Sequence, residues 1–387
     1  MNPERDEDWI ALSEPDIDEV ESEVVRAALR APRLSEGPFA ERFEAAFAQW
    51  TGRAHAVSVA SGTLGALLAL RALGIGPGDE VIVSAYGWHQ IAHAVAWVGA
   101  TPVCAEINYW TGCMNPARAA QHIGPRTRAI MAGNVNGHPA EWQALRELAD
   151  STGVALIEDS TEAIGSRYAG RRTGSFGDLA VFDFSQPSAL CVGEGGMVLT
   201  DDADMAAELR MLRRRDRGDR QSISAGSRVP LQAAMSELAA ALGLAQLARI
   251  ETLLARRKQV ESWYLEQMRT FEGIKPPYLG QDVDEVHWML YVVHLGARFT
   301  ASGRRQIIDD LAADHIEAAA YCLPLHQQFH YQQLGMARGQ LALTERIGDR
   351  SLALPLHAGL DEDQVRFIVK TLKDASVNVG AGAAIYL

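Results

Sequence analysis

The chain has 387 residues, of which 48% are hydrophobic and 22% are charged, and its formal net charge is −13 at pH 7. This length exceeds what one hydrophobic core usually organises, so we expect two domains, and the composition excludes fibrous and disordered proteins. The acidic balance argues against a nucleic-acid partner, because neutralising phosphates requires a basic surface.

The first part of the chain predicts two helices and then a strand, at residues 16–31, 38–50 and 56–60. Ser61-Gly62-Thr63 follows the strand, and leucines at helical spacing then predict a helix that ends near Gly74. A strand, small residues and a helix start point free backbone N–H groups at an anion. On its own this pattern is weak, because many helices begin with Ser or Thr as an N-cap.

Strands and helices then alternate along the chain. Short apolar runs predict strands and amphipathic runs predict helices, in the order strand 81–83, helix 90–98, strand 102–105, strand 129–132, helix 141–151 and strand 154–157. This spacing predicts a largely parallel sheet covered by helices on both faces. Ligands bind such sheets at the carboxyl ends of the strands. We therefore expect Ser61, Trp88, Asp159 and residues 185–188 to converge on one cleft.

A further apolar strand is predicted at residues 180–184, followed by a polar turn and the glycine-rich run 193–196. The glycines indicate a tight bend and a close approach of the backbone to a ligand. A basic run with six arginines then occupies residues 210–220. It is either a solvated helix end or an anion contact for a phosphorylated ligand or a neighbouring subunit.

The last third of the chain predicts a smaller α+β domain. A long helical pattern at 231–268 bridges the two parts, and it is followed by a strand and two helices, at 289–294, 304–314 and 361–372. Residues 376–387 are small and apolar with no helical period. We place the large domain at 1–255 and the small domain at 256–387.

Location and metal content follow from what the sequence lacks. No segment has 18 or more consecutive apolar residues, and the start, MNPERDEDW, does not resemble a signal peptide. The four cysteines have no metal-like spacing: Cys104, Cys113, Cys191 and Cys322. We expect no membrane span, no metal site and a cytoplasmic location.

Several motifs in order resemble the DegT/DnrJ/EryC1/StrS family, the sugar and cyclitol aminotransferases of the fold-type-I pyridoxal-phosphate (PLP) class. They cover nearly the whole chain: Ser35-Glu36-Gly37-Pro38, Ser61-Gly62-Thr63, LGIGPGDEVIV at 73–83, Ile157-Glu158-Asp159, Gly174-Ser175-Phe176-Gly177-Asp178, Gly193-Glu194-Gly195-Gly196 and LGLAQL at 242–247. The resemblance implies a fold-type-I aminotransferase-like α/β fold, with a mostly parallel sheet in the large domain and a smaller C-terminal α+β domain.

The resemblance also implies roles for single residues. Asp159 matches the aspartate that pairs with the pyridinium nitrogen and keeps the ring an electron sink; its alternative reading is an N-cap at a strand end. Trp88 matches the aromatic residue that stacks on the ring, with an ordinary core tryptophan as the alternative. Gly62 and Thr63 match the turn that cradles the phosphate, and Glu162 matches a residue that faces the ring oxygen.

Four positions depart from the family pattern. Ser188 stands where the family has the lysine that holds PLP, and a hydroxyl cannot form an imine. Asp183 replaces a serine that donates to the phosphate, and a carboxylate 4 Å from a phosphate costs about 4 kcal/mol per unit charge at an effective dielectric constant of 20. Gln232 replaces an asparagine that reaches the phosphate from the other subunit, and Ala234 replaces a basic residue. We expect no covalently bound cofactor and regard PLP or pyridoxamine phosphate (PMP) as doubtful partners.

Three hypotheses follow. In the first, the chain is a biosynthetic enzyme that has lost ordinary transamination, with Glu162, Ser188, His89 and Asp183 as acid–base groups around a small polar substrate; for His89 a satisfied polar residue at a helix start is the alternative. In the second, PMP is bound without a covalent link, as in the family's sugar dehydratases. In the third, the chain is a catalytically silent subunit of an active homologue. We expect a homodimer with sites at its interface, while the substrate stays open between a nucleotide-linked sugar, a cyclitol and an aromatic precursor.

Overall fold

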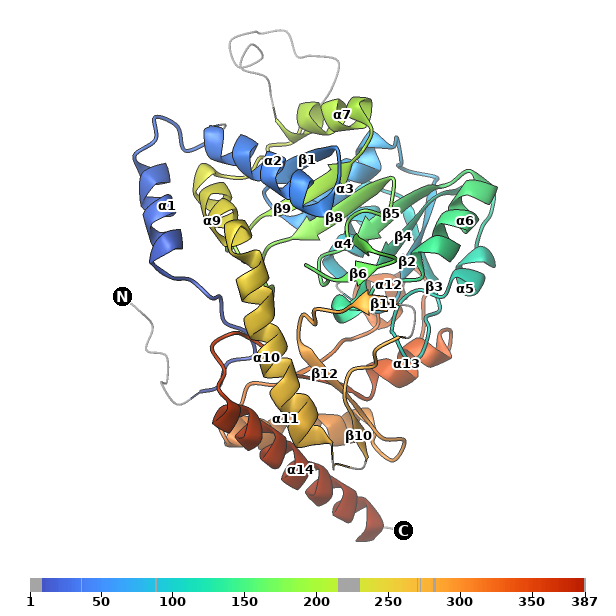
Figure 1. Ribbon diagram of the computed structural model, residues 1–387. Coiled ribbons are helices and arrows are strands. Elements are labelled where there is room, and N and C mark those ends of the chain that lie inside the picture. The colour runs from blue at the N-terminus through green and yellow to red at the C-terminus, as the bar shows by residue number, and fades with distance from the viewer. Residues whose placement is uncertain are drawn as a thin grey trace.

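The computed structural model describes residues 9–35, 37–87, 89–214, 230–269, 271, 273–280 and 283–385. Its centre is a seven-stranded sheet with the strand order β1-β9-β8-β5-β4-β2-β3 (Figure 1). The strands are β1 (His55–Val59), β2 (Glu80–Ser84), β3 (Thr101–Ala105), β4 (Thr127–Gly133), β5 (Ala155–Asp159), β8 (Leu179–Asp183) and β9 (Gly196–Thr200).

The sheet is mostly parallel, as predicted. Strands β3, β2, β4, β5 and β8 are joined by parallel pairings, and β9 is antiparallel to both of its neighbours, β8 and β1. The carboxyl ends of the parallel strands therefore meet at one edge. Ser84, Gly133, Asp159 and Asp183 are the last residues of β2, β4, β5 and β8, and this edge carries the candidate site.

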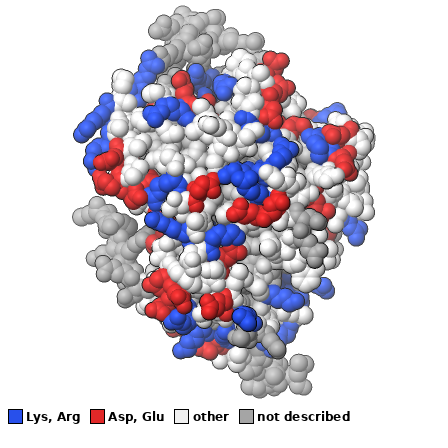
Figure 2. All heavy atoms as spheres, in the orientation of Figure 1, with Lys and Arg blue, Asp and Glu red and all other residues white. Residues whose placement is uncertain are grey.

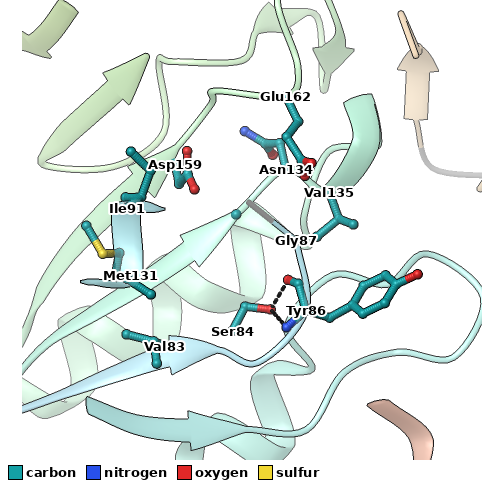
Figure 3. Close-up of a pocket in the computed structure, with 12 residues that line it drawn as sticks. Val83, Ser84, Tyr86, Gly87, Ile91, Met131, Asn134, Val135, Asp159 and Glu162 are labelled. Atoms are coloured by element: carbon teal, nitrogen blue, oxygen red, sulfur yellow. Dashed lines mark hydrogen bonds between the residues drawn. The ribbon is translucent and has the colours of Figure 1, made fainter. Parts of the chain in front are cut away.

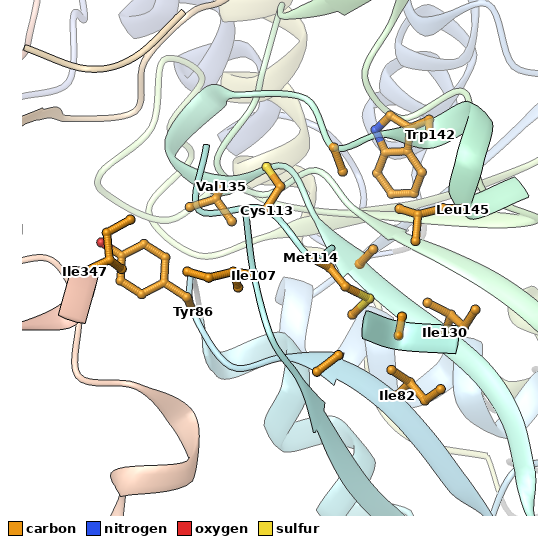
Figure 4. Packing of buried hydrophobic residues seen from close by; sticks show 14 of the residues in the cluster. Ile82, Tyr86, Ile107, Cys113, Met114, Ile130, Val135, Trp142, Leu145 and Ile347 are labelled. Atoms are coloured by element: carbon orange, nitrogen blue, oxygen red, sulfur yellow. The ribbon is translucent and has the colours of Figure 1, made fainter. Parts of the chain in front are cut away.

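Helices cover both faces of this sheet because its strands are apolar on both sides. Val81 and Val83 pack with α3 (Gly62–Ala72) and α4 (His89–Trp97), whereas Ile82 between them packs against α6 (Trp142–Thr152) on the opposite face. Figure 4 shows the second of these clusters, in which Ile82 and Ile130 lie near Leu145. Further helices of this part are α1 (Glu19–Leu29), α2 (Pro38–Thr51), α5 (Pro116–Ala120) and α7 (Ala203–Arg213).

A second sheet follows in the C-terminal third, with the order β10-β12-β14-β13. Its strands are β10 (Ile274–Lys275), β12 (Tyr291–Leu295), β13 (Ala319–Ala320) and β14 (Ser351–Leu354). The helices in this third of the chain are α11 (Ala301–Ala313), α12 (Phe329–Gln333), α13 (Ala342–Gly348) and α14 (Glu362–Ile385). A three-stranded sheet links the two parts, with β6 (Arg167–Tyr168), β7 (Arg171–Arg172) and β11 (Val283–Glu285). The prediction that residues 376–387 lack helical structure was wrong, because α14 continues to Ile385.

The predicted single helix over 231–268 was also wrong. The chain forms α9 (Glu237–Ala248) and α10 (Ile250–Met268), which are bent by 68° around Arg249. The Arg249 guanidinium binds the Asp16 and Glu21 carboxylates, so tertiary ion pairs accompany the break. Helix α10 runs from the seven-stranded sheet to the second sheet (Figure 1). The domain boundary proposed at residue 255 falls inside α10 and stays a prediction.

The surface carries both signs of charge. On the face shown in Figure 2, acidic and basic side chains are interspersed among the described residues, without a broad basic area. Within the described residues no single helix is long and apolar enough to cross a membrane, and α9 and α10 meet that test of length and composition only as a bent pair.

Candidate active site

A pocket opens at the carboxyl edge of the large sheet (Figure 3). It is lined by residues at the ends of β2, β4 and β5, in the segments that follow these strands and in α4: Val83, Ser84, Tyr86, Gly87, Ile91, Ala92, Met131, Gly133, Asn134, Val135, Asp159 and Glu162. Two carboxylates, Asp159 and Glu162, therefore share one small space. Of the residues that the sequence predicted to converge, Asp159 lines this pocket, whereas Ser61 and residues 185–188 are not among the lining residues, and Trp88 lies outside the described part.

Asp159 is the last residue of β5, and its carboxylate lines the pocket. Its Oδ1 atom accepts a hydrogen bond of 3.1 Å from the backbone N–H of Thr161. Burial raises the pKa of Asp159 to about 7, and the negative charges of Asp183 and Glu158 add to that rise. The charged form of a desolvated carboxylate of this kind would be stabilised by a cationic ligand in the pocket.

Glu162 lies almost fully buried beside Asp159. Its Oε1 accepts a 2.6 Å hydrogen bond from the Tyr321 hydroxyl, and its Oε2 accepts one of 2.8 Å from the Asn136 backbone N–H. Burial raises the pKa of Glu162 to about 8, against the opposing effect of these hydrogen bonds. Glu162 is therefore mostly protonated near neutral pH and can donate a proton.

Sequence reasoning missed Tyr321 and Asn136, the two partners of Glu162. Tyr321 comes from the C-terminal third, where its ring packs edge-on against Tyr86 at 5.5 Å and its carbonyl oxygen accepts a hydrogen bond from the Tyr86 hydroxyl. The Asn136 side chain binds both backbone groups of Leu290, at the start of the second sheet. These contacts tie the pocket to both sheets, and no local pattern in the sequence signals them.

The raised pKa of Glu162 predicts a change of stability with pH. The folded chain binds this proton more tightly than the unfolded chain, so its stabilising effect is complete below about pH 4.5 and is lost as pH rises through about 8. Between about pH 5 and pH 9 the wild type should lose more unfolding free energy than Glu162→Gln, by on the order of 3–5 kcal/mol. Urea unfolding across that range measures it, with the exposed Glu41→Gln as control. An unchanged pH slope in Glu162→Gln would contradict the assignment.

A buried network fixes the strand that carries Asp159. Glu158 points away from the pocket and accepts hydrogen bonds from the backbone N–H groups of Gly174 and Phe176, at 2.6 and 2.7 Å. Asn134 donates to the same carboxylate at 3.0 Å and accepts from Trp142 Nε1 at 2.7 Å. The run 174–178 is thus the partner of Glu158, which holds the end of β5 in place.

Asp183 and Gly62 come together at the start of α3. The Gly62 N–H donates a 2.7 Å hydrogen bond to Asp183 Oδ2, and Gly62 and Thr63 are the first two residues of that helix. Asp183 is buried, and its Oδ1 accepts from both the N–H and the hydroxyl of Ser185. The structure therefore places this carboxylate against the helix start.

The other predicted site residues are more scattered. Ser188 is buried in the turn between β8 and β9, where its hydroxyl accepts a 3.3 Å hydrogen bond from the Leu190 N–H. Gln232 is exposed and is not among the residues that line the pocket. His89 begins α4, but its side chain lies outside the part that the structure describes, as does Trp88. No group of metal-ligating side chains occurs in the described ranges.

The pocket fits one end of a pyridoxal-type cofactor. Asp159 offers a partly buried carboxylate to a ring N–H, and Glu162 offers a second acid–base group nearby. The start of α3, which the family resemblance assigns to the phosphate, is not among the residues that line the pocket, and its first N–H is already bound by Asp183. The basic run contributes Arg213, but that guanidinium is buried against Glu44 at 2.5 Å, and residues 215–220 lie outside the described part.

Solved structures with the same fold contain the cofactor. The Streptococcus pneumoniae protein Spr1654, assigned as a sugar aminotransferase, superposes with a TM-score of 0.90 in its PLP form and 0.89 in its PMP form. Its PLP form is 28% identical, with 96% of this chain and 99% of that chain covered. We expected no covalently bound cofactor and regarded PLP and PMP as possible but doubtful partners; the PLP and PMP forms of this similar protein contradict that expectation, because they argue against a chain without the cofactor. That expectation gave too much weight to single positions and too little to the retained ring site.

Curated relatives are similar over nearly their whole length. The chain is 35% identical to GDP-perosamine synthase of Caulobacter vibrioides, with 95% of this chain and 98% of the relative covered. It is 35% identical to dTDP-3-amino-3,4,6-trideoxy-alpha-D-glucose transaminase of Streptomyces venezuelae, with 90% of each covered. The family model of the DegT/DnrJ/EryC1/StrS aminotransferases matches residues 15–373. The chain therefore belongs to the DegT/DnrJ/EryC1/StrS aminotransferase family.

Proposed function

We propose that this chain acts on a nucleotide-linked sugar with a PLP-class cofactor. It holds the cofactor without a covalent bond and does not carry out the ordinary transamination cycle. The names of its relatives support the substrate class, since two that are 35% identical are named for GDP-linked and dTDP-linked amino sugars. The cofactor class is supported by the PLP and PMP forms of a similar protein. A cytoplasmic location belongs to the same proposal.

The proposal that the cofactor is not covalently bound is supported by the distribution of lysines. The whole chain has four, Lys258, Lys275, Lys370 and Lys373, and all of them come after residue 257. Lys258 pairs with Glu261 on α10, and Lys373 donates to the Gln267 carbonyl. None of the twelve residues that line the pocket is a lysine. The turn where the family resemblance expects the lysine holds Ser188 instead.

The residues of the pocket suggest how the chain would use the cofactor. When bound, the cofactor supplies an electron-poor ring that withdraws electrons from the substrate. Asp159 would hold the ring N–H through a charge-assisted hydrogen bond and fix the orientation of the ring. Glu162, protonated near neutral pH, would give a proton to the reacting side and take one back from the product, while the hydrogen bond from the Tyr321 hydroxyl holds its carboxyl group in place. Without a lysine amine, a repeated amino-transfer cycle lacks its usual base.

The assembly is part of the proposal as well. Gln232 is exposed in the single chain, on a segment that the family resemblance places in the neighbouring subunit's site. A homodimer that brings Gln232 to the partner's cleft is consistent with this exposure. Sedimentation of the purified protein measures the dimer directly.

The substrate class is tested by a single-turnover reaction. Protein loaded with PMP is incubated with a nucleotide-linked keto-sugar, and the sugar products are followed by mass spectrometry against the free sugar as control. We expect the nucleotide-linked sugar alone to be converted, in an amount no greater than the cofactor supplied. Continuous turnover with an amino donor would contradict the proposal. No conversion and no binding would favour a silent subunit.

A further inference from the structure

The first turn of α3 is closed by a carboxylate of the same chain. Helix α3 has 11 residues, and its first N–H, at Gly62, donates to Asp183 Oδ2 at 2.7 Å. Ser61 caps the same turn through the Leu64 N–H. Free N–H groups at a helix start are a ready site for a phosphate, and here a built-in carboxylate uses the first of them.

The contact between Asp183 and the helix start leaves no space for a ligand atom. A Cβ atom placed on Gly62 would lie 2.6 Å from Asp183 Cβ and 2.8 Å from its Oδ2. Gly196 of β9 packs on the same turn, since a Cβ there would lie 2.6 Å from the Gly62 nitrogen. Only glycine at both positions permits this packing. A phosphate could reach the Gly62 N–H only by displacing Asp183.

Asp183 is also well satisfied where it lies. Its side chain is 2% exposed, and its two oxygens accept from the Gly62 N–H, the Ser185 N–H and the Ser185 hydroxyl. Its charge acts on the pocket, because it helps to raise the pKa of Asp159. A phosphate dianion at the start of α3 would therefore meet the Asp183 carboxylate and a helix dipole that this carboxylate already neutralises.

We infer that Asp183 sets the anion specificity of this cleft, so that a pyridoxamine-type ring is bound through Asp159 while its phosphate contributes little affinity. The inference rests on the proposed function for the identity of the ring. In this inference the Asp183 carboxylate acts as an internal anion. It occupies the position at the start of α3 that the phosphate of a ligand would otherwise take. The cleft then accepts phosphorylated and unphosphorylated forms of the ring about equally.

Calorimetric titration of the wild-type protein with PMP and with pyridoxamine tests this without any variant. We expect the two dissociation constants to agree within about threefold. In Asp183→Ser the helix start is freed, and PMP should become the preferred ligand by at least about tenfold. Asp202→Ser is the matched control, because Asp202 also binds the first N–H groups of a helix, α7, away from the pocket. A tenfold preference for PMP in the wild type, or an unchanged ratio in Asp183→Ser, would overturn the inference.

A second measurement separates this inference from the proposed function. If neither ring compound binds the wild type or the variant, the proposed function fails, and thermal unfolding in inorganic phosphate then decides the role of Asp183. Phosphate should raise the unfolding temperature of Asp183→Ser and leave the wild type and Asp202→Ser unchanged. Equal shifts in all three proteins would show that Asp183 does not exclude an anion.

Discussion

Replacing Ser188 with lysine should give the protein a covalently bound cofactor. Ser188 is buried in the turn between β8, which ends at Asp183, and β9. Burial lowers the pKa of an amine and so raises the fraction of the neutral form that attacks a carbonyl. Ser188→Lys incubated with PLP should show a yellow chromophore that dialysis does not remove and that borohydride fixes to residue 188.

The control for that experiment is Ser188→Arg, which adds a cation of similar length that cannot form an imine. It should behave like the wild type and lose the chromophore on dialysis. If Ser188→Lys folds and yet gives no adduct at residue 188, the turn does not face the cofactor, and the assignment of this position to the family lysine is wrong.

Replacing Asp159 with asparagine should weaken cofactor binding by about 10- to 150-fold, the range expected for a hydrogen bond to a charged group. Asparagine keeps the shape and the contact to the Thr161 N–H but loses the charge that faces the pocket. Calorimetric titration with PMP measures the change. Asp178→Asn removes a carboxylate beside the same strand, where it binds Arg146 and the Leu156 N–H, and serves as the control.

The effect of Asp159→Asn should depend on pH. The pKa of Asp159 is raised to about 7, so its carboxylate is protonated at lower pH and ionised at higher pH. The ratio of the two dissociation constants should therefore grow as pH rises through about 7, while it should approach one at lower pH. A ratio that stays constant from about pH 6 to pH 8.5 would contradict the assigned role of the Asp159 charge.

The sequence predicted the sheet well because its strands are short apolar runs. The predicted strands at 81–83 and 129–132 fall within β2 and β4, and the one at 154–157 overlaps β5 and begins one residue before it. Their ends locate Asp159, and the motif spacing adds Glu162. The break between α9 and α10 was missed, because leucine and alanine continue on both sides of Arg249 and its partners Asp16 and Glu21 lie more than 200 residues away.

The candidate site was predictable only in part, for the same reason. Tyr321 binds Glu162 across 159 positions of sequence, and nothing near either residue signals the contact. The sequence indicated that Asp183 would repel a phosphate, but not that its carboxylate binds the Gly62 N–H. Family membership corrected the expectation about the cofactor, which single substitutions had led us to doubt.

The most direct test of a cofactor held without a covalent bond uses the wild-type protein. It is loaded with PLP, treated with borohydride and digested, and all peptides that contain Lys258, Lys275, Lys370 or Lys373 are examined by mass spectrometry. We expect PLP to bind, to leave on dialysis and to modify none of these lysines. Stoichiometric reduction of PLP onto any one of them would contradict this account.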